Sequence, residues 1–365
     1  MKPNRRDFIK KTAIAGTGAL LFGCTDNEKI KSVNVNFNKT YKWRMVTAWA
    51  PHFPLLGESA DDLAKSIEIM SGGRIKIQVY GGGELVPPLE AFDAVSQGVA
   101  ELGHAASYYW AGKTPSAQFF TSLPFGMNTP QMNAWLYHGG GIDLWHEAYT
   151  QFNLMAFPCG NTGAQMGGWF NKEINSINDV KGLKMRFPGI GGKVINKAGG
   201  TAVLSAGSEI YTNLERGVID ATDWIGPYHD YLMGFHEIAK YYYYPSWAEP
   251  TGVIELLINK SAFESLPVDL QSIVKEVASI QNAKLTGLFK KRNAEYYYKI
   301  KNETKVQFKK FPEDVLNSFR EFSKEAIEEI VQSDPMSKKV FESYKKYHEL
   351  FYSWDDIVEP NYQPL

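Results

Sequence analysis

The chain contains 365 residues, of which 44% are hydrophobic and 14% aromatic, and it has a formal net charge of −1. This near-neutral balance argues against a nucleic-acid partner, which normally requires a basic surface. The length suffices for two domains, and the aromatic share is typical of proteins that enclose small ligands, although large cores are equally aromatic.

The first 24 residues show the zones of an export signal. Arg5 and Arg6 precede an apolar run at 12–22 that is too short to span a bilayer. The basic, apolar and small-residue zones come in the order of a twin-arginine signal, which favours export over a disordered basic tail. The residues before Cys24 resemble a lipobox, so we expect Cys24 to be acylated after cleavage and the polar residues 25–40 to form a tether.

From residue 41 onward, strand and helix patterns alternate. Apolar residues recur with period two at 41–49, 74–80 and 99–106, and with helical spacing at 57–70 and 87–97. Glycines follow both helices, as expected because glycine readily adopts the left-handed conformation that ends helices. The alternation predicts a parallel sheet with crossover helices, whose third strand carries Tyr108 to its carboxyl end.

Residues 90–101 and 209–220 form two copies of one pattern. Each copy runs acid, aromatic, apolar, Gly-Val, acid, and the ungapped register sets Tyr109 against Tyr228. Two similar helix-to-strand units predict two lobes built alike. A cleft between such lobes is the natural ligand site.

The stretch 182–189 places one cation at the end of a short strand. Apolar residues alternate there with Lys184 and Arg186, and Pro188-Gly189 stops the strand. Open α/β sheets hold ligands at the carboxyl ends of their strands. A guanidinium at that point can hold a carboxylate through two parallel hydrogen bonds. The alternative is a surface arginine paired with a neighbouring acid.

Polar side chains near other element ends complete the candidate set. Asn161 and Gln165 lie in a predicted loop at 161–170 and offer uncharged amides, with turn roles as the alternative. Asp223 and Glu249 each lie close to a tryptophan at the end of a predicted element, where an uncompensated carboxylate would be costly. Either these acids face water, or they hold a cation.

No nucleotide-binding or catalytic motif is complete. A G-x-G-x-x-G pattern begins at Gly189, but Val194 stands where the third glycine belongs. Walker, G-x-S-x-G and H-E-x-x-H patterns are lacking, as is a metal-binding cysteine pair. His229 and His236 lie seven residues apart, which predicts one helical face. Without carboxylates at ligand spacing, we interpret them as ordinary polar residues.

The rest of the chain predicts connecting strands and long helices. We expect strands at 241–244, 251–259 and 306–308, the second of which crosses back to the first lobe. A helix from 268 to about 302, roughly 50 Å long, could brace both lobes, and a helix at 312–332 follows. The final helix begins at 335 and carries an apolar stripe that either packs on the body or forms a dimer.

At this point the chain resembles a family. The stretches 182–186 and 217–220, the export signal and the alternating lobes are similar to the substrate-binding subunit of tripartite ATP-independent periplasmic (TRAP) transporters, over nearly all of the mature chain. More specific stretches resemble the branch that binds 2-oxo acids such as pyruvate, or lactate, with a metal cation. These stretches are 106–110, 125–127, 133–137, 160–173 and 241–245.

The resemblance implies a site in which a guanidinium and a cation share one small acid. Arg186 would hold the ligand carboxylate, and Asn161 and Tyr108 would add hydrogen bonds. Gln165, Asp223, the backbone carbonyl of Trp224 and Glu249 would surround the cation and lie beside the ligand. All are oxygen donors, which suit sodium or calcium rather than zinc. With Arg186 at +1 and three carboxylates at −1 each, the site needs a cation. The family's 2-oxo acid binders often carry glutamate where Asp223 stands.

The resemblance also implies the fold and the partners. It predicts an α/β, type II-like two-lobed periplasmic binding protein, each lobe a mixed sheet flanked by helices. Lobe I would take 41–157 plus about 250–280, lobe II 158–249 plus about 281–332, and the C-terminal helix 333–365. The partners would be integral membrane permease subunits and, through that helix, a second copy of the chain.

Two alternatives from other classes stay open. A hydrolase or lyase could use Asp223 and Glu249 as an acid/base pair, although nothing else marks a sugar site. A receptor for a larger sugar acid or dicarboxylate would need a second basic group in the cleft.

Overall fold

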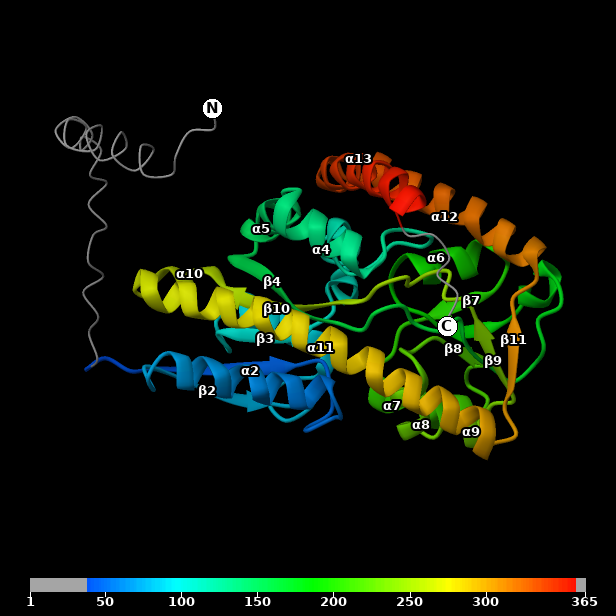
Figure 1. Cartoon of the computed structure of the whole chain (residues 1–365), viewed down its shortest axis with the longest axis horizontal. Coiled ribbons are helices and arrows are strands. Elements are labelled where there is room, and N and C mark those ends of the chain that lie inside the picture. Colours follow the sequence, from blue (N-terminus) through cyan, green and yellow to red (C-terminus); the bar gives the residue numbers. More distant parts are fainter. Residues whose placement is uncertain (1–37, 359–365) are drawn as a thin grey trace, which may run out of the picture. The chain divides into compact units, whose positions relative to one another are not determined.

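The computed structural model describes residues 38–358, which contain two β-sheets (Figure 1). The predicted export signal, Cys24 and most of the predicted tether lie outside these residues. Among the helices from residue 38 to 358, none is both long enough and apolar enough to cross a membrane.

The first sheet defines lobe I and has the strand order β2-β1-β3-β10-β4. Its first three strands are parallel, and β10 runs antiparallel to both β3 and β4. The predicted parallel sheet therefore covers only the first three strands, because the late strand β10 enters from the other lobe. The strands are β1 (Tyr41–Thr47), β2 (Ile75–Tyr80), β3 (Leu102–Ala105), β4 (Leu154–Asn161) and β10 (Val253–Asn259).

The second sheet defines lobe II and has the order β11-β9-β5-β8-β6-β7. Here β7, β6 and β8 are parallel, and β5 runs antiparallel to both β8 and β9. Apart from the added edge strand β11, this repeats the topology of lobe I, so the prediction of two lobes built alike is confirmed. The strands are β5 (Gly168–Phe170), β6 (Lys184–Arg186), β7 (Thr201–Val203), β8 (Ala221–Thr222), β9 (Tyr241–Tyr244) and β11 (Gln307–Lys310).

The duplicated sequence pattern forms the same unit in both lobes. Helix α3 (Ala91–Ser96) leads into β3, and α7 (Gly207–Glu215) leads into β8. The turn after each helix contains a glycine in the left-handed region, with φ of 74° at Gly98 and 69° at Gly217. The predicted helix at 87–97 begins instead with a short 3₁₀ turn, Pro88–Glu90.

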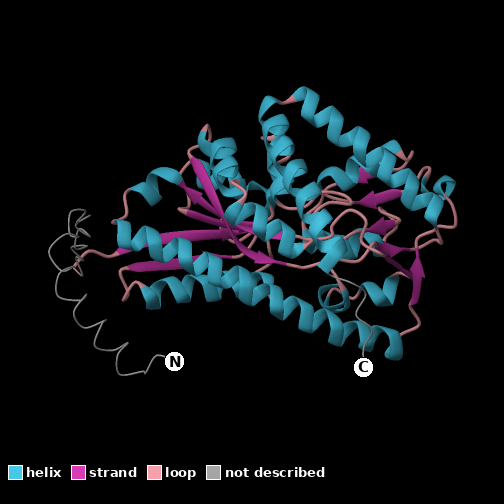
Figure 2. Ribbon diagram, turned by 45° about the horizontal axis from the view of Figure 1, so that its top comes forward, coloured by secondary structure: helices cyan, strands magenta, loops and turns pink. Residues whose placement is uncertain are grey.

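Helix α11 (Val268–Glu303) joins the two lobes along their length (Figure 2). It packs against α2 and β4 of lobe I and against α8 of lobe II. Its 36 residues correspond to about 54 Å, so the predicted bracing helix is confirmed. The remaining helices are α2 (Leu56–Met70), α4 (Thr129–His138), α5 (Gly141–Thr150), α6 (Gly189–Lys197), α8 (Pro227–Leu232), α9 (Phe235–Ile238), α10 (Lys260–Glu264), α12 (Glu313–Ser333) and α13 (Pro335–Val358).

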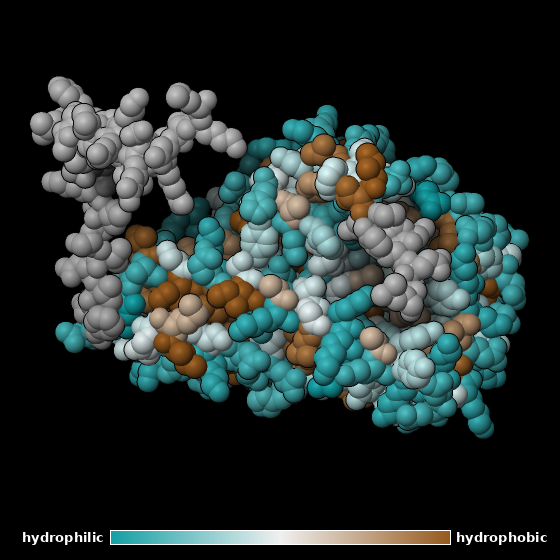
Figure 3. Space-filling model, in the orientation of Figure 1, coloured by the Kyte–Doolittle hydropathy of each residue, from teal (hydrophilic) through white to brown (hydrophobic). Residues whose placement is uncertain are grey.

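The C-terminal helix α13 packs on the body most closely along its first half, and near its end Asp355 accepts a hydrogen bond from the Gln131 side chain at 2.6 Å. Val340 and Tyr344 are buried, and the Tyr344 hydroxyl accepts a hydrogen bond from the Met127 amide at 2.6 Å. Further along, Leu350 and Trp354 are 58% and 63% exposed. Figure 3 shows apolar residues gathered over α13 and over the first half of α11.

Two local predictions are wrong. Asn161 is the last residue of β4 rather than the start of a loop, because β10 pairs with β4 as far as Val253 opposite Asn161. His229 and His236 lie on two separate helices, α8 and α9, because Gly234 between them adopts a left-handed φ of 76°.

Candidate functional site

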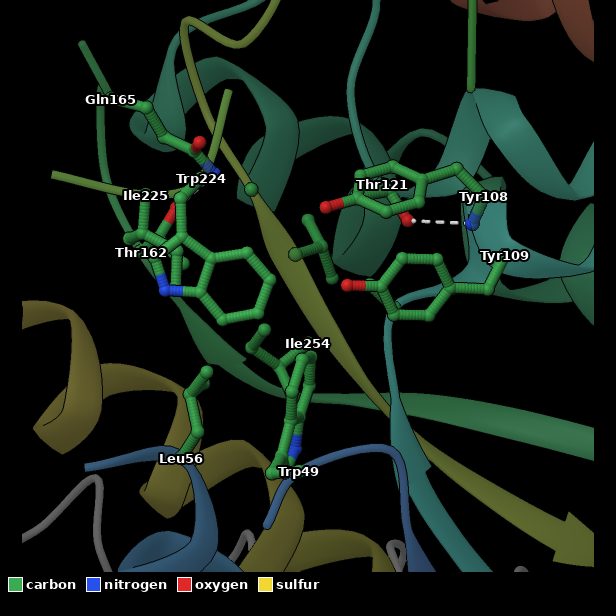
Figure 4. A pocket seen from close by; sticks show the side chains of 13 residues that line it. Trp49, Leu56, Tyr108, Tyr109, Thr121, Thr162, Gln165, Trp224, Ile225 and Ile254 are labelled. Atoms are coloured by element: carbon green, nitrogen blue, oxygen red, sulfur yellow. Dashed lines mark hydrogen bonds between the residues drawn. The ribbon is translucent and has the colours of Figure 1, made fainter. Parts of the chain in front are cut away.

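A small cavity lies where strand ends of the two lobes meet (Figure 4). The space between its atoms, including the part open to solvent, is about 290 Å³. A space of this size suits a small ligand. It is lined by Trp49, Leu56, Ala106, Tyr108, Tyr109, Thr121, Thr162, Gln165, Trp224, Ile225, Gly252, Val253 and Ile254.

Lobe I supplies a wall of neutral aromatic groups. The 3₁₀ helix Ser107–Trp110 follows β3, and its Tyr108 amide donates to the Thr121 hydroxyl at 3.2 Å. The hydroxyl ends of Tyr108 and Tyr109 point toward Trp224 across the cavity (Figure 4). Burial raises the pKa of both tyrosines, so both remain protonated and can donate hydrogen bonds at neutral pH.

The short strand β6 carries Arg186 into the interior of lobe II. The side chain is only 1% exposed, so the alternative of a surface arginine is wrong. Its Nη1 donates to the Asp223 carbonyl at 3.1 Å, and Nε and Nη2 both donate to the Ser205 carbonyl at 3.4 Å. The guanidinium also lies 5.1 Å from the Trp224 ring centre. Backbone carbonyls thus orient the cation without neutralising it, which leaves its charge for an anion.

Asp223 and Glu249 are buried close to that cation, with exposures of 2% and 3%. Burial raises the pKa of both carboxyls, the charge of Asp223 raises that of Glu249 further, and Arg186 opposes both shifts. One oxygen of each, Oδ2 of Asp223 and Oε2 of Glu249, has no hydrogen-bond partner, and neither has Oε1 of Gln165. Three unpartnered buried acceptors are the donor set of a hard cation, so these residues fit sodium or calcium.

Within residues 38–358, no three His, Cys, Asp or Glu side chains form a group that could hold a metal ion. A cation beside Asp223 and Glu249 would therefore need further oxygen ligands, and the unpartnered Oε1 of Gln165 is one such group. An all-oxygen shell suits sodium or calcium rather than zinc.

Two chain segments cross between the lobes beside the cavity and carry Gln165 and Glu249. The Gln165 amide N–H donates to the Glu249 carbonyl at 3.2 Å, and the Thr162 amide donates to the Gly252 carbonyl at 2.9 Å. The Gln165 side-chain Nε2 donates to the Thr162 hydroxyl at 3.2 Å, which leaves its Oε1 unpartnered. The crossing segments therefore fix two of the candidate cation ligands relative to each other.

Asn161 sits at the same crossing with its amide already bonded inside the protein. Its Oδ1 accepts from the Gly163 amide at 2.8 Å and from the hydroxyls of Thr251 and Thr129 at 3.0 and 3.2 Å. Its Nδ2 donates to the Thr251 hydroxyl at 2.9 Å. Of the residues predicted for the site, Tyr108, Gln165 and Trp224 line the cavity, whereas Asn161, Arg186, Asp223 and Glu249 lie outside its lining.

A buried carboxylate that sequence reasoning missed supports the turn after Trp224. Asp230 accepts hydrogen bonds from the amides of Ile225 and Gly226 at 3.3 and 3.1 Å. It also accepts from the Trp169 indole at 2.9 Å and from the Tyr242 hydroxyl at 2.6 Å. Burial raises the pKa of Asp230 to about 6. Asp230 thereby fixes the backbone that presents Asp223 and Trp224.

Other residues at the cavity were also missed by sequence reasoning. Trp49 ends the predicted first strand, and Tyr109 lies in the ungapped register with Tyr228, so both had a signal in the sequence. Thr121 and Thr162 had none, because short hydroxyl side chains occur in every kind of loop.

Two lobes of the same build enclose a small cavity, and a buried arginine that can bind an anion lies beside a set of oxygen ligands. This arrangement defines a solute-binding protein rather than a nucleotide-binding one. Residues 45–334 match the family of bacterial extracellular solute-binding proteins, family 7 (DctP). The chain belongs to this family of TRAP transporter solute receptors, which operate outside the cytoplasm.

Known relatives agree over most of the chain. The monocarboxylate 2-oxoacid-binding periplasmic protein of Nostoc sp. is 38% identical and covers 98% of both chains. A TRAP periplasmic solute-binding protein from Pseudoalteromonas atlantica, solved with sodium and pyruvate, is 40% identical with a TM-score of 0.86, covering 88% of this chain and 98% of its own. A Bordetella bronchiseptica receptor, a mixed-occupancy dimer with calcium and picolinate in its active site, is 36% identical with a TM-score of 0.86, covering 88% and 96%.

Proposed function

We propose that this protein is an extracytoplasmic receptor that binds a small 2-oxo or 2-hydroxy monocarboxylate, such as pyruvate, another 2-oxo acid or lactate, together with a metal cation. It then delivers the acid to a TRAP permease for secondary uptake. The observation that carries the proposal is the buried Arg186 beside the unpartnered carboxylate oxygens of Asp223 and Glu249.

In this proposal Arg186 binds the ligand carboxylate with the N–H groups that the backbone carbonyls leave free. Tyr108 donates a hydrogen bond from lobe I, and Trp224 and Gln165 contact the ligand at the cavity wall. Asn161 is also assigned to the ligand, although its amide would have to exchange the Thr251 bond for one to the ligand.

Gln165, Asp223, the Trp224 carbonyl and Glu249 are assigned to the cation. When bound, the cation offsets the charges of the two carboxylates and of the ligand. Without it, Arg186 at +1 faces three groups at −1, which leaves a net charge of −2 in a buried site. Calcium would leave the sum at zero and sodium at −1. We therefore expect the acid to bind only when the cation is also bound.

The composition of the cavity wall favours a small monocarboxylate over the other ligand classes. The lining residues are aromatic, aliphatic or uncharged polar, and among the described residues the only buried basic group placed at the site is Arg186, whereas a sugar acid or dicarboxylate would need a second one. We also propose that the protein is not an enzyme, since the family serves transport. Asp223 and Glu249 are then cation ligands rather than the acid/base pair of a hydrolase or lyase.

The remaining proposals concern the location and the partners. The chain is exported by the twin-arginine route and anchored through an acylated Cys24. The lobes take the predicted ranges, 41–157 with about 250–280 and 158–249 with about 281–332, except that β4 extends lobe I to Asn161. Integral membrane permease subunits are the partners. Residues 333–365 form a homodimer contact, which the exposed Leu350 and Trp354 and the dimeric Bordetella bronchiseptica receptor support.

Native mass spectrometry tests the main proposal. Protein purified without refolding should release one small carboxylic acid, and metal analysis should give one sodium or calcium per site. Isothermal titration of stripped protein should then show tight pyruvate binding that fails when both cations are withheld, calcium by a chelator and sodium by a sodium-free buffer. Equal binding with and without both cations, or turnover of the acid, would overturn the proposal. Cleavage at Cys24 and lipid mass on the mature N-terminus test the anchor, and light scattering tests the dimer.

A further inference from the structure

We propose that His229 is an interlobe latch: it fastens the 50–56 segment of lobe I over the cavity and thereby slows ligand release. Nothing in the assignment of the ligand and cation ligands uses this residue. Its place in α8, five residues after Trp224, puts it on the lobe II side of the cavity.

The 50–56 segment is a compact turn between β1 and α2. Its Phe53 amide donates to the Ala50 carbonyl at 3.0 Å, and His52 and Leu55 adopt left-handed φ angles of 51° and 58°. The segment ends at Leu56, which is fully buried and lines the cavity. The position of this turn therefore decides whether the cavity is closed on the lobe I side.

His229 bonds directly to that turn. Its Nε2 lies 2.7 Å from the Pro54 carbonyl oxygen, and its side chain is fully buried. A carbonyl can only accept, so Nε2 carries the proton. Nδ1 has no hydrogen-bond partner, and burial lowers the pKa of His229 to about 4. The ring is therefore neutral and donates across the lobes.

Aromatic rings pack on both sides of the His229 ring. Phe53 stacks on His229, with ring centres 5.3 Å apart, and also meets the Trp224 ring edge-on at 6.4 Å. On its other side His229 lies against Phe289 of the bracing helix α11, 5.1 Å away. A lobe I ring is thus held between two lobe II rings, one of which lines the cavity.

These contacts join groups that separate when lobes move apart about a hinge. An interaction made only in the closed form shifts the closed population by its own free energy and acts mainly on the release rate. Gly189 of lobe II makes another close approach to lobe I, since a Cβ there would lie 3.2 Å from Cβ of Tyr108. Elsewhere the Phe125 amide of lobe I donates to the Trp247 carbonyl of lobe II at 2.8 Å, and the His229 bond is the directional contact made to the 50–56 segment.

The test rests on the proposed function for its probe, which is pyruvate with calcium. Stopped-flow displacement should show release about fivefold faster for His229→Phe, which keeps the ring packing but loses one hydrogen bond, and about tenfold faster or more for His229→Ala. Association rates should change little. His236→Phe is the matched control, because His236 in α9 stacks on Tyr231 of its own lobe at 4.1 Å.

Hydrogen exchange of peptides covering 53–60, measured without ligand, gives a readout that does not depend on the probe. Exchange should be faster in both His229 variants than in the wild type and in the His236 variant. If pyruvate release and hydrogen exchange are as slow in His229→Phe as in the wild type, the proposed latch is wrong. If the wild type fails to bind pyruvate, the proposed function fails and exchange alone decides the latch. If the alanine variant does not fold, the phenylalanine variant decides.

Discussion

The two lobes share one frame and differ in the chemistry placed on it. In lobe II, Arg186 of β6 pairs with Thr222 of β8; in lobe I the equivalent strands pair Val46 with Gly103. The ungapped register likewise sets His104 against Asp223. The arginine and the carboxylate of lobe II thus correspond to a valine and a histidine in lobe I.

The lobe I histidine is neutral. Burial lowers the pKa of His104 to about 3, and its Nδ1 accepts from the Trp49 indole at 2.8 Å. Lobe I therefore brings aromatic rings and hydroxyls to the cavity but no charge. In the proposed site, lobe II therefore supplies the charged groups that bind the ligand. The uncharged wall of lobe I excludes water and thereby strengthens the interactions of those charges.

The largest expected effect comes from replacing the guanidinium group of lobe II that is proposed to hold the ligand carboxylate. Arg186→Lys keeps the charge but loses the planar fork and its bonds to the Ser205 and Asp223 carbonyls. We expect pyruvate affinity to fall about 1,000-fold, the cost of a mispaired buried charge. Titration calorimetry measures it, with the exposed Arg216→Lys as the control. A loss below tenfold would show that the ligand carboxylate needs only a positive charge at this position and not the planar fork.

The second-largest expected effect concerns the two buried carboxylates that distinguish the chemistry of lobe II from that of lobe I. Asp223→Asn and Glu249→Gln keep an oxygen but remove a charge, so pyruvate affinity in calcium should fall about 100-fold. Calorimetry across a calcium series should show that the coupling between calcium and pyruvate is reduced. Unchanged coupling in both variants would remove these residues from the cation site.

The same pair predicts a pH dependence of the ligand-free protein. Folding raises the pKa of both acids, so their contribution to stability is present below their unfolded pKa of about 4 and is lost as the pH rises through their folded values. The melting temperature without metal should fall between pH 5 and 8, and calcium with pyruvate should flatten that slope. A slope that calcium leaves unchanged would count against a shared cation.

Much of the frame was predictable because the local patterns are strong. Period-two strands, left-handed glycines after α3 and α7, and the long helix α11 are all written locally in the sequence. Arg186 was predictable as a strand-end residue, although the alternation of 183–187 did not reveal that both faces of the strand are covered there. That burial comes from packing against other segments.

The errors trace to partners that lie far apart in the chain. The end of β4 at Asn161 is set by β10, whose pairing with it shifts register between Ile254 and Glu255. Asp230 gained its role from Trp169, 61 residues away. The split between α8 and α9 had a local signal in Gly234, but the contact of His229 with Pro54, 175 residues away, had none.

A fourth prediction compares one buried, cation-free carboxyl in each lobe. In lobe I, Glu255 accepts from the Trp110 indole and from the Tyr149 hydroxyl, and burial raises the pKa of Glu255 to about 7. In Glu255→Gln, the amide oxygen can accept from the indole and the amide N–H can donate to the Tyr149 hydroxyl oxygen, so no two donors face each other and only the Tyr149 O–H loses its acceptor. Since the stability contributed by Glu255 is lost as the pH rises through 7, the variant should gain about 3 kcal/mol on the wild type between pH 5 and 8.

The lobe II counterpart should behave in the opposite way. Asp230 accepts from four donors, and in Asp230→Asn one amide N–H would meet the Trp169 indole N–H, which cannot accept. Asp230→Asn should therefore destabilise by about 2 kcal/mol at pH 5. Because the raised pKa of Asp230 makes the wild type lose stability as the pH rises through about 6, this cost should be smaller at pH 8. Urea unfolding of both variants at pH 5 and 8 measures the contrast. Equal changes in unfolding free energy for the two variants would mean that Glu255 and Asp230 play the same structural role in their lobes.

The smallest effect tests the neutral wall of lobe I. Tyr108→Phe removes a hydroxyl that points toward Trp224, and Tyr109→Phe removes the hydroxyl that interacts with Arg186. Each neutral hydrogen bond contributes about 1 kcal/mol, so each variant should bind pyruvate about fivefold more weakly. Calorimetry at saturating calcium measures this loss, with Tyr211→Phe in α7 as the control. A loss as large as that of Arg186→Lys would mean that lobe I recognises the ligand as strongly as lobe II, and the division of labour between the lobes would fail.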